Sequence, residues 1–237
     1  HLQANEVHPI TEATMELFLT DCAEIGVKGI SLVSDGESSI SQAFVFSIVR
    51  GHELGINMAV GSNSYVIDRA MSEKILPCLT YLRVNFSGGE RDRYCQIMGV
   101  KPALYDRAVQ NIKDMVAVKR ERGLKVNIGI QMVLMPEMKD QIIPFAKLGK
   151  ELRVDFAVIK HCSDDEDGAL GVDYDKYAEL ENLLKEAETY SDDGYACVVK
   201  WSKIHDHGGR SYQRCFGPPF MLQISGSGLI APCGMLF

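Results

Sequence analysis

The sequence has no run of about 18 consecutive apolar residues, so it predicts no membrane-spanning helix. It also has no excess of basic residues: 25 Lys and Arg stand against 32 Asp and Glu, and the formal net charge is −7. A broad positive face is therefore not expected, and we predict neither nucleic acid nor a membrane as a partner. No signal peptide is visible at the amino terminus.

Paired cysteines are missing too. The seven cysteines are an odd number and are scattered along the chain, which argues against the disulfide framework of a small secreted protein. The reducing cytoplasm is therefore the expected compartment.

Apolar residues are plentiful, at 46% of 237 positions, which is ample for one large buried core. Short apolar runs alternate with helical patterns, and this alternation predicts a parallel sheet with right-handed crossovers. The expected strands are 29–33, 56–60, 81–86, 125–134 and 154–160, and the expected helices are 11–25, 40–54, 66–76, 102–122 and 139–152. Thr11 is expected to cap the first helix, and Pro144 to kink the last one.

The first predicted helix has no strand before it, and the chain starts at His1 without a methionine. Because each helix of a (β/α) barrel follows a strand, we expect a missing first strand upstream of His1 and treat the chain as a segment of a longer protein. The predicted fold is an α/β, partial (β/α)6 TIM-like barrel over residues 1–162.

The character of the sequence changes after this predicted barrel. Residues 163–195 hold an acidic loop and an amphipathic helix, which we expect to close the barrel. Residues 196–237 contain short apolar runs at 197–201, 220–224 and 229–231, separated by turn residues. They predict a small β-hairpin appendage.

Polar residues stand at the carboxyl ends of the predicted strands, and a parallel barrel brings these ends to one rim. They are Asp35, Gly36, Glu37, Ser62, Asn63, Asn85, Ser87, Gln131 and Lys160. One acid, several amides and hydroxyls and one amine suit a small zwitterionic ligand that carries a sugar, with Glu37 taking an ammonium group. Ordinary turns use the same residue types, so composition alone leaves a purely structural role open.

The order of these segments resembles that of the radical S-adenosylmethionine enzymes. The segment 34–38, Ser-Asp-Gly-Glu-Ser, is similar to the family's Gly-Gly-Glu-Pro motif, with Asp35 in place of a Gly and Ser38 in place of the Pro. Residues 82–87 resemble the family's fourth strand, in which Asn85 matches a position that contacts the cofactor. Residues 126–136 and 154–160 resemble the fifth and sixth strands, so the resemblance covers nearly the whole chain.

This resemblance implies a mechanism and its cofactors. The family binds S-adenosylmethionine on a [4Fe–4S] cluster and forms a 5′-deoxyadenosyl radical, which abstracts hydrogen from a substrate. It implies that the rim residues named above bind the cofactor, with Glu37 on the methionyl amine. The implied partners are a small-molecule or peptide substrate and an electron donor such as flavodoxin or ferredoxin.

The family's Cys-x3-Cys-x2-Cys motif is absent from this chain. In the family the motif follows the first strand, so we expect the cluster ligands upstream of His1 and expect this segment alone to be inactive. In the tail, Cys215-x12-Gly228-x4-Cys233 resembles the start of a SPASM or twitch extension. It implies that Cys215 and Cys233 bind an auxiliary iron–sulfur cluster, although two isolated free cysteines would give the same spacing.

Two other functions remain open from the residues. The barrel could be a relic without a cluster that binds a ligand or a partner protein. Alternatively, Lys160 could be the nucleophile of a Schiff-base aldolase, but that function leaves Cys215 and Cys233 unexplained. The sequence before His1 would separate the enzyme from the relic, since only the enzyme needs the three cysteines.

Overall fold

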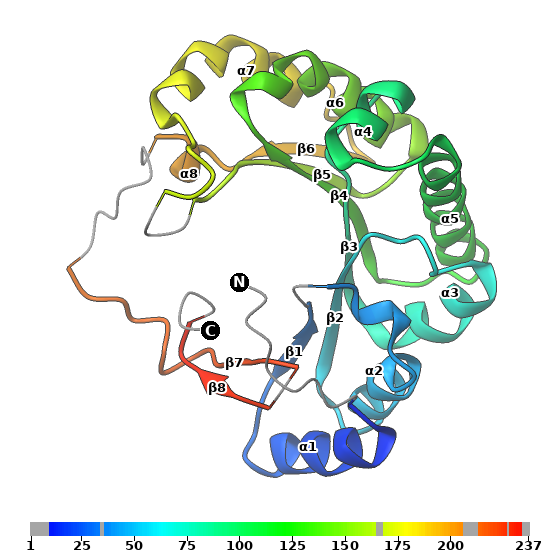
Figure 1. Ribbon diagram of the computed structural model, residues 1–237. Coiled ribbons are helices and arrows are strands. Elements are labelled where there is room, and N and C mark those ends of the chain that lie inside the picture. The colour runs from blue at the N-terminus through cyan, green and yellow to red at the C-terminus, as the bar shows by residue number, and fades with distance from the viewer. Residues whose placement is uncertain (1–9, 34–35, 165–167, 206–212, 227, 234–237) are drawn as a thin grey trace.

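The computed structural model describes residues 10–33, 36–164, 168–205, 213–226 and 228–233. In these ranges six parallel strands form one sheet in the order of the sequence, and the sheet curves into an open barrel (Figure 1). The strands are β1 (Gly29–Leu32), β2 (Asn57–Ser62), β3 (Leu79–Asn85), β4 (Asn127–Leu134), β5 (Phe156–His161) and β6 (Ala196–Val199). The predicted partial barrel is therefore confirmed.

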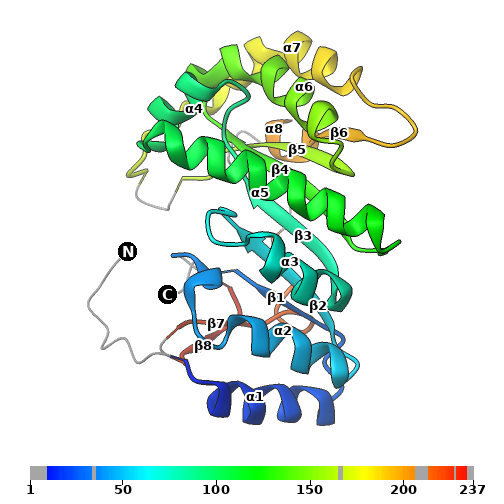
Figure 2. The same cartoon turned by 90° about the vertical axis from the view of Figure 1, so that its right-hand side faces the viewer.

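Helices cover the outer face of this sheet, and Figure 2 shows them stacked along it from α1 to α7. They are α1 (Glu12–Glu24), α2 (Phe44–Glu53), α3 (Arg69–Ile75), α4 (Arg91–Met98), α5 (Pro102–Glu121), α6 (Ile142–Leu152) and α7 (Glu181–Glu188). The short α8 (Trp201–His205) lies inside this row, in contact with β5 (Figure 1). Short 3-10 turns are η1 (Ser38–Ile40), η2 (Leu76–Cys78), η3 (Pro136–Gln141) and η4 (Tyr174–Leu180). No helix among the described residues is long and apolar enough to cross a membrane.

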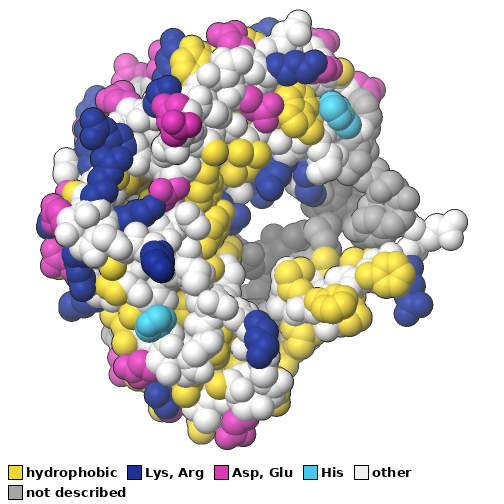
Figure 3. All heavy atoms as spheres, turned by 180° about the vertical axis from the view of Figure 1, so that it is seen from behind, with side chains coloured by type: hydrophobic (Ala, Val, Ile, Leu, Met, Phe, Trp, Pro, Cys, Tyr) yellow, Lys and Arg dark blue, Asp and Glu magenta, His cyan; other side chains and the backbone are white. Residues whose placement is uncertain are grey.

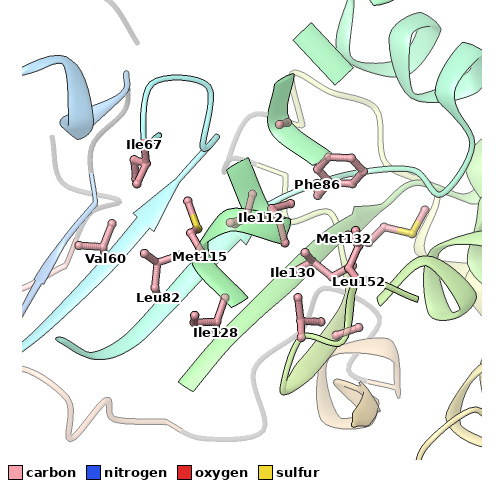
Figure 4. Close-up of a cluster of buried hydrophobic side chains, with 14 of the residues drawn as sticks. Val60, Ile67, Leu82, Phe86, Ile112, Met115, Ile128, Ile130, Met132 and Leu152 are labelled. Carbon is pink, nitrogen blue, oxygen red and sulfur yellow. The ribbon is translucent and has the colours of Figure 1, made fainter. Parts of the chain in front are cut away.

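The core lies between the sheet and the helices. Leu82, Ile128 and Ile130 point from neighbouring strands toward Ile112 and Met115 of α5, and all five side chains are fully buried (Figure 4). Burying each such side chain contributes about 1.5–3 kcal/mol. The alternation of side chains along a strand turns every second residue away from this core and toward the inside of the barrel.

Local sequence explains several helix ends. Thr11 accepts a hydrogen bond from the backbone N–H of Thr14 and so caps α1, as predicted. Pro102 occupies the first turn of α5, where its missing N–H costs nothing. Gly26 and Gly123 follow α1 and α5 with φ values of +83° and +60°, a conformation that favours glycine. These signals are local, which is why the sequence alone reveals them.

Two expectations about elements were wrong. Residues 197–201 were assigned to the appendage, but Ala196–Val199 form β6, which pairs in parallel with β5 inside the barrel sheet. The helix expected from residue 139 begins as α6 only at Ile142, so Pro144 lies in its first turn and does not kink it. The chain before α6 forms η3 instead. The helix α4 was not predicted at all.

The inner face of the sheet changes character along its strands. Near the amino ends, the rings of Tyr81 on β3 and Phe156 on β5 stack with centroids 5.2 Å apart. They meet across Gly129 of β4, where a Cβ atom would come within 2.2 Å of the Phe156 ring. Toward the carboxyl ends the inner residues become polar. The barrel therefore has an aromatic pair, Tyr81 and Phe156, near its amino end and polar residues at its carboxyl rim.

The described part of the tail is a small antiparallel hairpin of β7 (Gln223–Ile224) and β8 (Ile230–Ala231). It lies on the open side of the barrel (Figure 1). Gly228 has a φ of +85° in the turn that joins the two strands. The predicted hairpin in the tail is confirmed.

Candidate active site at the carboxyl rim

Glu37, which follows β1, is tied to the end of β2. Its Oε1 accepts hydrogen bonds from the Ser62 hydroxyl at 2.7 Å and from the Ser39 backbone N–H at 3.2 Å, and the Ser39 hydroxyl also donates to it. Its Oε2 accepts one hydrogen bond, from the Asn63 backbone N–H at 2.7 Å. A carboxylate offers about four lone-pair positions, so Oε2 retains capacity for one more donor.

Of the two predicted site residues that precede Glu37 in the sequence, the structure describes only Gly36. Gly36 is exposed. Asp35, which the sequence assigned to the cofactor, lies outside the described residues. Glu37 itself is half-buried, so its carboxylate is held by protein donors and remains open to a ligand on one side.

Asn85 and Gln131 form a second polar unit, inside the barrel. They are register partners on β3 and β4, and the Gln131 side-chain amide donates to the Asn85 side-chain oxygen at 3.3 Å. Gln131 is only 5% exposed. The Asn85 side-chain nitrogen and the Gln131 side-chain oxygen have no partner among the described residues. This pair can therefore give a ligand one donor and one acceptor.

The three other rim residues, Ser62, Asn63 and Ser87, are engaged with the protein. The Ser62 hydroxyl donates to Glu37 and accepts from the Ser64 backbone N–H at 2.9 Å. The Asn63 side-chain oxygen accepts from the backbone N–H of the next residue but one. The Ser87 hydroxyl accepts from the Val133 backbone N–H at 3.2 Å. Each of them orders the loop or strand end on which it lies.

Lys160 lies at the end of β5 and is half-buried. Burial lowers the pKa of its amine, and the positive charges of Arg83 and Lys203 lower it further. Arg83 is therefore part of this site, although the sequence analysis did not assign it. The signal was available, because Arg83 is two residues before Asn85 and so falls on the same face of β3.

The tail cysteines Cys215 and Cys233 stand on either side of the β7–β8 hairpin. Both are free and exposed, and the Cys215 sulfur accepts from the Gly217 backbone N–H. Within the described ranges, no group of three or more His, Cys, Asp or Glu side chains is arranged to hold a metal ion. An auxiliary cluster on these cysteines therefore stays a prediction.

Comparison with known proteins adds the fold family. No family model and no curated protein sequence matches the chain. Among solved structures, Streptococcus suis SuiB bound to S-adenosylmethionine is 18% identical, with a TM-score of 0.72 over 97% of this chain and 54% of that one. The structure of anSMEcpe with bound AdoMet is 12% identical, with a TM-score of 0.72 over 99% of this chain and 68% of that one.

The chain has the radical S-adenosylmethionine fold. Archaeal TYW1 is a further match, 19% identical with a TM-score of 0.51 over 76% of this chain and 61% of that one. The chain spans about half the length of SuiB. In a barrel of this kind the sites are built at the carboxyl ends of the strands, where Glu37, Asn85 and Lys160 lie.

Proposed function

We propose that this chain is the barrel of a radical S-adenosylmethionine enzyme that acts on a peptide. The observation that carries the proposal is the fixed carboxylate of Glu37 at the rim of this fold. Two donors from the end of β2 hold it, the Ser62 hydroxyl and the Asn63 backbone N–H. An acid oriented in this way is preorganised to take a positively charged amine.

The rim fits the chemistry of S-adenosylmethionine. The open position on Glu37 Oε2 suits the methionyl ammonium, and the pair of Asn85 and Gln131 suits ribose hydroxyls or the methionyl carboxylate. Ser62 and Asn63 orient Glu37 and so act on the cofactor through it. When bound with its [4Fe–4S] cluster, the cofactor supplies a 5′-deoxyadenosyl radical for hydrogen abstraction.

The residues of this chain have the remaining tasks. The chain contains no Cys-x3-Cys-x2-Cys segment, so the proposal concerns the full-length protein, in which other residues hold the cluster. The stacked rings of Tyr81 and Phe156 line the amino end of the lumen with apolar surface, which suits the protein's part in radical chemistry.

A peptide substrate is the finer part of the proposal. Two proteins with this fold have been solved with peptides: SuiB with its precursor peptide SuiA, and anSMEcpe with the Kp18Cys peptide. The sheet does not close between its edge strands β1 and β6 (Figure 1), and the proposal has the peptide enter from that side.

The test is anaerobic reconstitution of the full-length protein, with measurement of iron, visible absorbance and 5′-deoxyadenosine. We expect an iron–sulfur absorbance and reductant-dependent 5′-deoxyadenosine. Glu37→Gln should weaken S-adenosylmethionine binding by about tenfold or more, because a charge-assisted hydrogen bond contributes about 1.5–3 kcal/mol. The matched control is Glu24→Gln, an exposed acid at the end of α1. A full-length protein that holds no iron would refute the enzyme and favour a binding protein.

A second candidate rests on Lys160, whose lowered pKa increases the share of neutral, nucleophilic amine at pH 7. TYW1, which shares the fold, has been solved with a lysine–pyruvate adduct. In a Schiff-base reaction the Lys160 nitrogen would attack a carbonyl carbon, and water would leave as the C=N bond forms. Borohydride with pyruvate should then label Lys160 irreversibly. An unlabelled Lys160 by peptide mass spectrometry would exclude this candidate.

A further inference from the structure

Arg83 is a cation on the inner face of the barrel, and the described residues offer it no hydrogen-bond or ion-pair partner. It lies on β3, two residues before Asn85, and its inner position follows from the burial of Leu82 and Val84 on the opposite face. Its Nε is buried and makes no hydrogen bond. Among the described residues, no acidic side chain forms an ion pair with Arg83. Such a group is costly to bury, because charged donors lose their water without compensation.

The backbone around Arg83 leaves room for its guanidinium. In register with Arg83 on β2 is Gly61, whereas its register partner on β4, Gly129, is covered by the Phe156 ring. A Cβ atom at position 61 would lie 3.3 Å from Arg83 Nη2. The guanidinium therefore lies over the bare backbone of Gly61 on β2.

Two further cations extend this positive region. Lys160 on β5 is half-buried on the same inner face of the sheet, and Lys203 on α8 is exposed. The positive charges of Arg83 and Lys203 both lower the pKa of the Lys160 amine. None of the three forms a salt bridge within the described ranges. Figure 3 shows a hollow through the molecule with Lys and Arg side chains on its wall. The protein has a net charge of −7, so this interior is opposite in sign to the chain as a whole.

We propose that Arg83 binds a carboxylate of the substrate inside the barrel, with Lys160 at the rim and Lys203 adding positive charge, so that the substrate is an acidic peptide. The planar fork of an arginine matches a carboxylate with two parallel hydrogen bonds, and lysines add charge at short range. The inference rests on the proposed function, in that it names the substrate class of the same barrel. It reassigns Lys160 from the cofactor to the substrate.

The position of Arg83 favours the substrate over the cofactor as the source of the carboxylate. Two strand residues correspond to about 6–7 Å, so Arg83 lies deeper in the lumen than Asn85 by about that much. Glu37 and Asn85, which suit the cofactor, mark the rim. A group that reaches Arg83 must therefore pass below the rim, which is where a substrate and not the cofactor would extend.

The test measures peptide binding to the full-length protein by calorimetry, without reductant, so that no catalysis is required. The probes are Ac-Ala-Glu-Ala-NH2, its Gln counterpart, and the Gln peptide with a free carboxyl terminus. We expect one of the two acidic peptides to bind at least about tenfold more tightly than the neutral one, about 1.4 kcal/mol. Which acidic peptide binds identifies the carboxylate as a side chain or a chain end.

Variants locate the effect. Arg83→Gln should abolish the preference for the acidic peptide, and Arg83→Lys should retain part of it. The matched control is Lys113→Gln, which removes one exposed positive charge from the outer surface of α5 and should change nothing. Arg83→Lys keeps the test valid if the Gln variant fails to fold, which thermal melting would reveal.

Two results would overturn the inference. One is equal affinity for acidic and neutral peptides, or no binding of either acidic peptide at concentrations on the order of 10 mM. The other is an Arg83→Gln variant that binds S-adenosylmethionine more weakly but binds decarboxylated S-adenosylmethionine as before, since Arg83 would then hold the cofactor's carboxylate. Failure of the proposed function would be seen in a different measurement, the reconstitution assay, as the absence of iron and of 5′-deoxyadenosine.

Discussion

The hydroxyl of Ser62, the last residue of β2, lies 2.7 Å from the Glu37 carboxylate that follows β1. This hydrogen bond joins two strand ends that are 25 residues apart in the sequence. It makes the orientation of Glu37 a property of the barrel and not of its own loop. A ligand that binds Glu37 therefore depends on the end of β2 as well as on the loop that carries the carboxylate.

Ser62→Ala should weaken S-adenosylmethionine binding several-fold and lower the free energy of unfolding by about 0.5–1.5 kcal/mol, because Glu37 and the Ser64 N–H both lose a partner. Ser72→Ala is the matched control. Ser72 on α3 is fully buried, and its hydroxyl has no hydrogen-bond partner, so its removal should be neutral or stabilising. Calorimetry and urea unfolding measure both effects. Equal behaviour of the two variants would contradict the role of Ser62.

Gly129→Ala should lower the free energy of unfolding by about 1–3 kcal/mol, the usual range for overpacking. The added methyl group would come within 2.2 Å of the Phe156 ring and force it away from Tyr81. Gly226→Ala is the control, since nothing lies within 4 Å of a Cβ atom there. The urea midpoint reports the difference, and near-ultraviolet circular dichroism reports the displaced rings. An unchanged urea midpoint would mean that the stacked rings do not require a glycine at position 129.

Lys160→Met should reveal a pH-dependent cost of the buried amine. The folded-state pKa of Lys160 lies below its ordinary value of 10.5, so the unfolded chain binds more protons between the two values. The free energy of unfolding of the wild type therefore rises with pH through that window. Its difference from that of Lys160→Met should shift in favour of the wild type as the pH approaches 10.5. Urea unfolding from neutral pH to about pH 10 measures the gap. Lys113→Met, which removes an exposed amine from the outer surface of α5, is the matched control.

Asp155→Ala should destabilise the protein without changing the affinity for S-adenosylmethionine. Asp155, just before β5, accepts a hydrogen bond from the Ile128 backbone N–H at 2.7 Å and pairs with Lys119 of α5. Its loss leaves a buried donor unsatisfied, which costs about 1–3 kcal/mol. The residue belongs to the amino-terminal end of the barrel, which serves stability and not binding. A large loss of cofactor affinity in a folded variant would contradict this division.

Much of the fold could be predicted from the sequence, because the signals are local. The alternation of apolar runs with helical patterns determined the parallel barrel, and Thr11 and Pro102 marked helix starts by their own hydrogen-bonding chemistry. The place of Glu37 directly after a strand predicted its position at the carboxyl rim. The sixth strand was assigned to the tail appendage, because Ala196–Val199 is short and only its pairing with β5 identifies it as part of the barrel.

The candidate site divides in the same way. Its residue types and their positions after strands were determined by the sequence, because hydrophobic periodicity shows where the strands end. Only the tertiary structure decided that the Ser62 hydroxyl holds Glu37, that Gln131 pairs with Asn85, and that Arg83 Nε finds no hydrogen-bond partner in the described part of the chain. The physical reason is that hydrogen bonds and unpaired charges between strands depend on register and on side chains far away in the chain, and no local pattern records them.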